Sequence, residues 1–151
     1  MDTPVADLLL GALAGVVGTL AMSMLEYPTY RARGLRAVPV YEMNLMLARR
    51  IAGPTLGGKL PVAVLTHFGD GMFLGAVFML AWSWLGAPSL ILAGLAYGVM
   101  LGIGSNLLHR TLTGRLLIRS REGRAGILLT MITHPLYGVV VGTVVWLLAA
   151  S

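Results

Sequence analysis

The chain has 151 residues, of which 57% are hydrophobic and only 11% are charged. Several apolar runs exceed the roughly 18 residues that a helix needs to cross a bilayer, so the composition excludes a soluble globular domain and predicts a polytopic membrane protein. The absence of cysteine excludes disulfides, thiolate metal sites and cysteine nucleophiles.

Four apolar stretches predict an all-α, four-helix membrane bundle that forms a single domain. The first covers about residues 5–27, and no Lys or Arg precedes it as in a cleaved signal peptide, so we expect it to be retained as a spanning helix. The other three cover about residues 61–86, 89–109 and 126–150. The lipid bilayer is therefore the first predicted partner of this chain.

The 11 basic residues all lie in two connections between these helices. They are Arg31, Arg33, Arg36, Arg49, Arg50 and Lys59 in the first connection, and Arg110, Arg115, Arg119, Arg121 and Arg124 in the second. Because basic loops stay on the cytoplasmic side, both connections are predicted to be cytoplasmic and both termini to lie outside, in an inner (plasma) membrane. Topology thus explains the net charge of +5, and no nucleic-acid partner is expected.

The first connection contains a short amphipathic segment, about residues 39–52. It begins with Pro39 and then places apolar residues at helical spacing among polar ones: Val40, Met43, Leu47 and Ile51. This pattern predicts an interfacial helix on the cytoplasmic membrane surface. A helix that binds a partner protein is the alternative.

One motif occurs twice and predicts an internal repeat. Thr66-His67 and Thr133-His134 are each followed by glycines four and eight positions after the histidine, which share one helical face with it. These glycines are Gly71, Gly75, Gly138 and Gly142. The sequence therefore predicts two repeated helical hairpins, related by an axis along the membrane normal.

The first and third helices match in the same way. Gly11 and Gly15 align with Gly94 and Gly98, and this alignment places Glu26 opposite His109. Small residues four apart, the GxxxG pattern, let helix backbones approach closely in lipid, so the glycines are predicted to pack helices together.

These motifs also carry a resemblance to a known family. A glycine-rich first helix, His67-Phe68 with small residues as far as Gly75, a glycine-rich third helix and the closing His134 to Gly138 segment resemble the YagU-like membrane proteins of bacteria and archaea. The resemblance implies a four-helix inner-membrane fold. The family has no established activity, so the resemblance implies no activity for this chain.

Ionisable groups near the middle of a span indicate the candidate site. A charge at a helix centre costs about 2.5 to 3.5 kcal/mol on insertion scales, so such groups face the bundle. Asp70 is predicted near mid-membrane, with His67 and His134 as its candidate partners. We expect Glu26, Asn106 and His109 to form the inner mouth of this site.

The sequence leaves three functions open. The first is a site for a proton or a small cation at His67, Asp70 and His134, serving transport and requiring a homo-oligomer because four helices are few for a pore. The second is a redox subunit that holds a b-type haem between His67 and His134. The candidate cofactors are therefore haem and, at the same histidines, a transition metal. The third is a non-catalytic scaffold in which the polar residues only fix helix order. No enzyme motif is recognisable, so a protein that is not an enzyme is expected.

Overall fold

The computed structural model describes residues 4–57, 60–85, 89–114, 117 and 120–149. All regular structure in these ranges is helical, which confirms the predicted all-α fold. The elements are α1 (Pro4–Arg33), η1 (Leu35–Ala37), α2 (Pro39–Gly57), α3 (Leu60–Leu85), α4 (Leu90–Thr113) and α5 (Arg121–Ala149). Within the described residues, α1, α3, α4 and α5 are long and apolar enough to span a membrane. The chain is therefore a multi-pass integral membrane protein.

Three of the spanning helices are longer than the apolar stretches that predict them. α1 continues past residue 27 to Arg33, α4 past residue 109 to Thr113, and α5 begins at Arg121 and not at residue 126. Hydropathy marks only the part of a helix that lies in hydrocarbon, whereas the helix itself ends where the backbone turns. Gly34 (φ 78°) and Gly114 (φ 66°) provide those turns in the left-handed region, which glycine adopts without strain.

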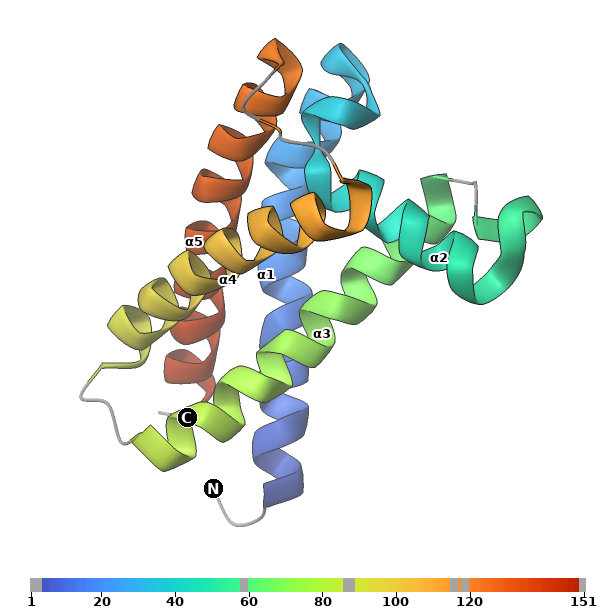
Figure 1. Cartoon of the computed structure of the whole chain (residues 1–151). Coiled ribbons are helices and arrows are strands. Elements are labelled where there is room, and N and C mark those ends of the chain that lie inside the picture. Colours follow the sequence, from blue (N-terminus) through green and yellow to red (C-terminus); the bar gives the residue numbers. More distant parts are fainter. Residues whose placement is uncertain (1–3, 58–59, 86–88, 115–116, 118–119, 150–151) are drawn as a thin grey trace.

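The four spanning helices form a curved array in the order α3, α1, α5, α4 (Figure 1). α1 packs against α3 and α5, and α5 packs against α4, whereas α3 and α4 make few contacts with each other. These two edge helices meet through the Tyr97 hydroxyl of α4, which donates to the Leu74 carbonyl of α3 over 2.9 Å. The array therefore has two edges that touch locally and leave a space between them elsewhere.

The remaining helix, α2, closes one end of this space. It packs mainly against α3 and also contacts α4 (Figure 1). A small core of Val38, Val40 and Tyr41 joins it to α1, α3 and α5 through Tyr30, Leu60 and Leu129. The segment predicted to lie on the membrane surface therefore buries its first turns against the protein. It is interrupted at Gly53, whose φ is 78°.

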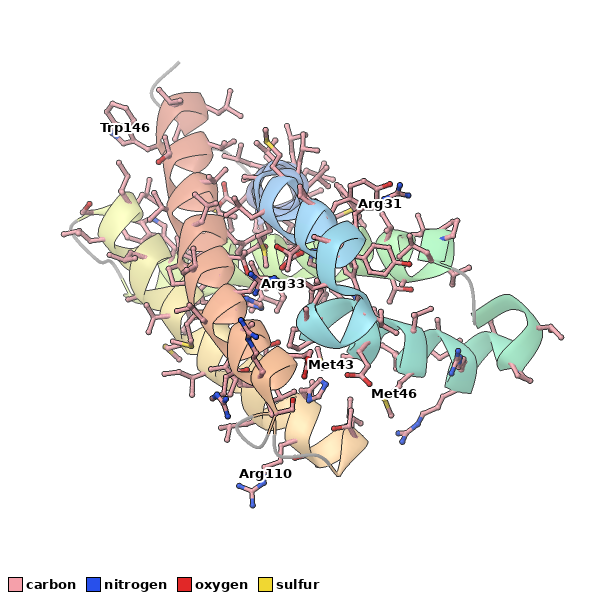
Figure 2. The ribbon with its side chains drawn as sticks, turned by 90° about the horizontal axis from the view of Figure 1, so that it is seen from above. Arg31, Arg33, Met43, Met46, Arg110 and Trp146 are labelled. Carbon is pink, nitrogen blue, oxygen red and sulfur yellow. The ribbon has the colours of Figure 1, made fainter. Side chains whose placement is uncertain are left out.

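The described arginines gather at the same end of the molecule as α2, which we call the arginine end. They are Arg31, Arg33, Arg49, Arg50, Arg110, Arg121 and Arg124, on α2 or at the adjacent ends of α1, α4 and α5. Figure 2 views this end and labels three of them. The beginning of α1 and the end of α5 lie at the opposite end (Figure 1).

Glycines bring the backbones together in both helix pairs. A Cβ atom at Gly15 of α1 would meet the carbonyl of Gly71 on α3, and one at Gly98 of α4 would meet the carbonyl of His134 on α5. In the predicted repeat Gly98 is the equivalent of Gly15, and Gly138 that of Gly71, so Gly98 should meet Gly138. Since Gly98 meets His134 instead, the α4–α5 pair is shifted by one helical turn relative to the α1–α3 pair. The duplication itself stays a prediction, and the two hairpins are packed in different registers.

Candidate functional site

A glutamate and a histidine from different helices face each other inside the bundle. Glu26 of α1 is 1% exposed and His67 of α3 is 4% exposed. Glu26 Oε2 lies 3.1 Å from His67 Nε2, and Thr133 of α5 donates from Oγ1 to Glu26 Oε1 over 3.2 Å. The two facing atoms make no well-aligned hydrogen bond within the described part of the chain. Since a carboxylate accepts and an imidazole nitrogen either donates or accepts, this pair can share, gain or lose a proton.

The second histidine of the repeat is held by its own helix. His134 Nδ1 lies 3.1 Å from the carbonyl oxygen of Thr130, one turn earlier on α5. A carbonyl only accepts, so we assign the hydrogen of the neutral ring to Nδ1. Nε2 is then the nitrogen that is available to accept a proton. The residue is 8% exposed and borders the cavity described below.

Asp70 of α3 has its hydrogen-bond partner on α2. The side-chain amide of Asn44 is oriented so that both its nitrogen and its oxygen are hydrogen-bonded. Nδ2 donates to Asp70 Oδ2 over 3.1 Å, and Oδ1 accepts from the His67 backbone N–H over 3.2 Å. Asn44 is 1% exposed, whereas Asp70 is half-buried. No hydrogen bond or ion pair joins Asp70 to either histidine among the described residues, so the predicted pairing of Asp70 with a histidine is not the arrangement found.

Tyr41 connects α2 to the same group. Its ring centroid lies 5.7 Å from that of His67, and the two rings meet edge to face. Burial, and secondarily the Glu26 carboxylate, raise the pKa of the Tyr41 phenol. Tyr41 therefore remains a neutral hydroxyl beside the buried pair.

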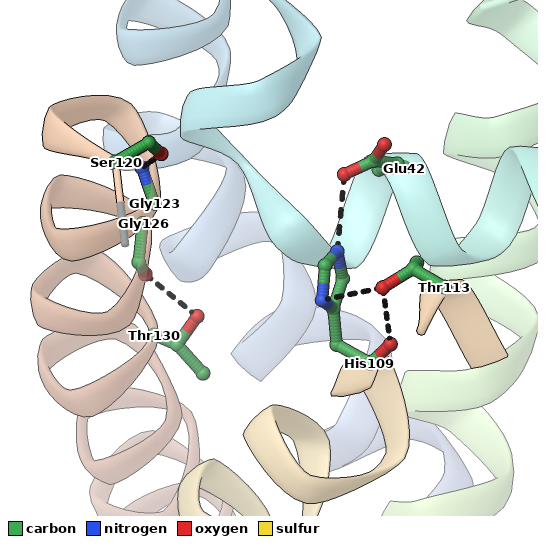
Figure 3. A network of polar contacts seen from close by, with 7 residues as sticks. All are labelled: Glu42, His109, Thr113, Ser120, Gly123, Gly126 and Thr130. Atoms are coloured by element: carbon green, nitrogen blue, oxygen red, sulfur yellow. Dashed lines mark hydrogen bonds and ion pairs between the residues drawn. The ribbon is translucent and has the colours of Figure 1, made fainter. Parts of the chain in front are cut away.

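A second carboxylate–histidine pair joins α2 to α4 (Figure 3). His109 of α4 is fully buried, and its Nε2 lies 3.0 Å from Glu42 Oε2 of α2. Thr113 Oγ1 lies 3.5 Å from the other ring nitrogen, Nδ1, and donates to the His109 carbonyl over 2.8 Å. This pair fastens α2 to α4 and is separate from the Glu26–His67 pair.

A cavity of about 620 Å³ lies between α3 and α4, and we call it the α3–α4 cavity. Side chains from all five α-helices line it, and most of them are apolar. Its polar lining residues are Thr19, Asn44, His67, Asp70, Ser105, His134 and Tyr137. Its position follows from the helix order, because α3 and α4 are the two edges that do not pack along their length.

The structure brings three of the six predicted site residues to one cavity. His67, Asp70 and His134 all line the α3–α4 cavity. Glu26, expected at the inner mouth, is instead buried against His67. Of the other two expected mouth residues, His109 pairs with Glu42, and Asn106 donates to the Gly102 carbonyl of its own helix over 2.9 Å. Glu26 is therefore a partner of His67, and Asn106 bonds within α4 and does not line the cavity.

Sequence reasoning missed three residues that hold the predicted site residues in place. Asn44 and Glu42 lie on α2, which was expected to contact lipid and not the spanning helices. Thr133 donates to Glu26. Its place in the repeated Thr-His motif was the sequence feature that could have marked it as a functional residue. Glu42 and Asn44, two polar residues set among the apolar residues of α2, were local signs that this helix is buried on one side.

The donor atoms are better suited to a proton than to a metal or a haem. Among the described residues, no three His, Asp or Glu side chains are grouped closely enough to hold a metal ion. Bis-histidine ligation of haem needs a free nitrogen on each ring facing the same space. His67 Nε2 faces Glu26 Oε2 instead, so His67 would have to leave the glutamate in order to bind iron.

Comparison with known proteins adds no family to this description. No family model, no curated protein and no solved structure matches the chain. The resemblance to YagU-like proteins accordingly rests on the motifs around His67 and His134, and it stays a prediction.

Proposed function

We propose that this protein exchanges protons at a buried site made by Glu26, His67, Asp70 and His134, and that this exchange serves transport across the membrane. The observation that carries the proposal is the Glu26–His67 pair, two buried ionisable groups whose facing atoms lie 3.1 Å apart. In membrane helices such groups are costly, and they occur where protons or ions are handled.

The chemistry of the pair explains how it would work. With one proton between them, the carboxyl and imidazole groups are either both neutral or an ion pair, and the net charge is zero in both cases. A second proton, or the loss of the first, leaves a net charge in a medium of low dielectric constant, where its cost depends strongly on neighbouring groups. Movement of His134, Asp70 or a bound cation near the pair would therefore control whether the pair takes up or releases a proton.

The same groups favour a proton over a small metal cation. Thr133 already donates to Glu26 Oε1, so this oxygen holds a hydrogen-bond donor where a metal ion would need a free ligand atom. One carboxylate and one imidazole are fewer ligands than stable metal sites use.

The assembly and orientation belong to the same proposal. Four spanning helices enclose little space, so we propose a homo-oligomer in an inner membrane. The arginine end would face the cytoplasm, because arginine-rich loops are retained on that side. Protons would then enter the site past α2.

Proton flux in proteoliposomes tests this function. Protein reconstituted with a trapped pH-sensitive dye should dissipate an imposed pH gradient, and Glu26→Gln should abolish that flux because the pair loses its titratable carboxyl group. Glu122→Gln is the matched control, since it makes the same change at an exposed residue in the first turn of α5. Equal flux in wild type and Glu26→Gln would overturn the proposal and favour the scaffold alternative.

A further inference from the structure

We propose that the α3–α4 cavity binds a lipophilic organic cation, an amine or onium ion with a large apolar body, which enters from the bilayer. This inference deepens the proposed function and rests on it, because it names the class of substrate that proton exchange would drive. Four observations carry it: the cavity's opening, its size, its charge and the chemistry of its lining.

The cavity opens to the surface that faces lipid. Three of its lining residues are among the exposed apolar side chains of α3 and α4: Phe73 is 66% exposed, Met100 69% and Leu108 48%. All three lie in helices long and apolar enough to span the membrane. An exposed apolar side chain in such a helix contacts acyl chains, so a ligand would reach the cavity from the bilayer.

Its volume suits a compact organic molecule. At about 620 Å³, it falls within the range of roughly 300 to 1,000 Å³ typical of small-molecule sites. Gly104 of α4 lines the cavity, and a Cβ atom there would meet no other atom within 4 Å. Unfilled space therefore extends to the backbone of one wall.

The charge of the lining selects a cation. Asp70 is the acidic residue that borders the cavity, and no Lys or Arg is among its described lining residues. Asn44 bonds to Asp70 Oδ2, and the half-buried carboxylate remains accessible from the cavity. A carboxylate that borders an apolar cavity is stabilised by a positive partner, which a lipophilic cation supplies and a neutral lipid does not.

The rest of the lining matches the body of such a ligand. Met22, Met43 and Met100 provide flexible, polarisable thioethers that adapt to ligands of different shape. Phe73 and Tyr137 present aromatic rings, which attract organic cations through their faces. The apolar lining thus suits a ligand that carries its charge within a large hydrophobic body.

Competition for Asp70 couples this ligand to protons. The cation is attracted to the ionised carboxylate, and protonation of Asp70 removes that attraction, so binding should weaken as the pH falls. The titratable groups around Asp70 are His67 on α3, Glu26 on α1, Tyr41 on α2, and His134 and Tyr137 on α5, whereas α4 contributes the uncharged Ser105. Protonation of the two histidines adds positive charge near the cavity and acts in the same direction.

Equilibrium binding of tetraphenylphosphonium to the full-length protein in lipid nanodiscs tests the inference. This probe keeps its charge at every pH, so any pH dependence comes from the protein. We expect saturable binding at about pH 8, weaker binding at about pH 5, and affinity at least about tenfold lower in Asp70→Asn. Asp7→Asn is the matched control, because Asp7 lies on α1 and does not line the cavity. Tetraphenylsilane, a neutral molecule of similar shape, should not compete with the probe.

A second variant tests the cavity without touching a charge. Gly104→Leu should fill the space and weaken binding by a similar factor. Gly69→Leu should leave binding unchanged, because a Cβ at Gly69 also meets no atom within 4 Å and that residue does not line the cavity. Equal affinity in wild type, Asp70→Asn and Gly104→Leu, or effective competition by tetraphenylsilane, would overturn the inference. Proton flux of the same purified variants, measured after reconstitution into proteoliposomes, shows separately whether the proposed function stands.

Discussion

At the scale of single residues, Glu26 shows how a buried carboxyl group is accommodated in an apolar bundle. Its Oε1 accepts a hydrogen bond from Thr133 of α5, and its Oε2 faces His67 of α3. One side chain on α1 thus contacts the two helices between which α1 is packed. An unpaired charge in this place would cost several kcal/mol, so both partners are required.

Thr133→Val should therefore destabilise the protein. Valine has nearly the same shape as threonine but cannot donate, so Glu26 Oε1 would remain buried without its hydrogen bond. We expect the free energy of unfolding to fall by about 1 to 3 kcal/mol, measured by denaturation in mixed micelles.

Thr143→Val is the control for this change. Thr143 lies two to three turns further along α5, and its hydroxyl donates only to the Val139 carbonyl of the same helix, over 2.8 Å. Its replacement should change stability by no more than about 0.5 kcal/mol. Equal losses in the two variants would show that the Thr133–Glu26 bond has no special importance.

At the scale of helices, the glycine interfaces decide how the two hairpins pack. Gly15 meets Gly71, whereas Gly98 meets His134 one turn away from the position that the repeat predicts. A one-turn shift is about 5.4 Å along the helix axis. It explains why Glu26 and His67 pair within the first hairpin, while His109, the predicted equivalent of Glu26, pairs with Glu42 of α2 and not with His134.

Gly98→Ala should loosen the α4–α5 interface. The new methyl group would meet the His134 carbonyl and the Pro135 Cα, which are backbone atoms that cannot rotate away. We expect a loss of about 1 to 3 kcal/mol in thermal or denaturant unfolding. Gly104→Ala, on the same helix and facing open space, should be neutral or slightly stabilising because alanine is the better helix former. The expectation fails if both variants unfold alike.

At the scale of the whole molecule, the helix order creates the cavity and α2 closes one end of it. Because α3 and α4 are the edges of the array, the space between them is open along the membrane-facing side. At the arginine end, α2 holds both edges, bonding to Asp70 of α3 through Asn44 and to His109 of α4 through Glu42. A change in either contact would alter access to the site.

The orientation of the whole molecule can be tested with single cysteines, since the natural chain has none. Arg121→Cys and Ala149→Cys lie at opposite ends of α5, and both positions are exposed. In intact cells a membrane-impermeant maleimide should label Ala149→Cys and spare Arg121→Cys, because arginine-rich loops remain cytoplasmic. Lysis should expose both sites to the reagent, and labelling of Arg121→Cys before lysis would reverse the predicted topology.

Local composition was enough to predict the helices of this protein. The free energy of moving an apolar stretch into lipid depends on that stretch alone, so the four spans can be read along the chain, and glycines with positive φ mark where two of the helices end. The clustering of arginines in two connections is a property of the sequence as well. The sequence also predicted that the two histidines and Asp70 face the bundle, since exposing them to lipid is costly, and all three line the α3–α4 cavity.

The partners of these residues were decided only by tertiary structure. Which carboxyl group meets His67 depends on the rotation of α1 and on its register against α3, and backbone contacts between glycines set both. The burial of Asn44 and Glu42 depends on how α2 docks across two helices distant in sequence. Hydropathy and spacing describe one helix at a time, whereas these contacts form where several helices meet. For that reason the sequence predicted Glu26 at the inner mouth of the candidate site, and the structure places it against His67.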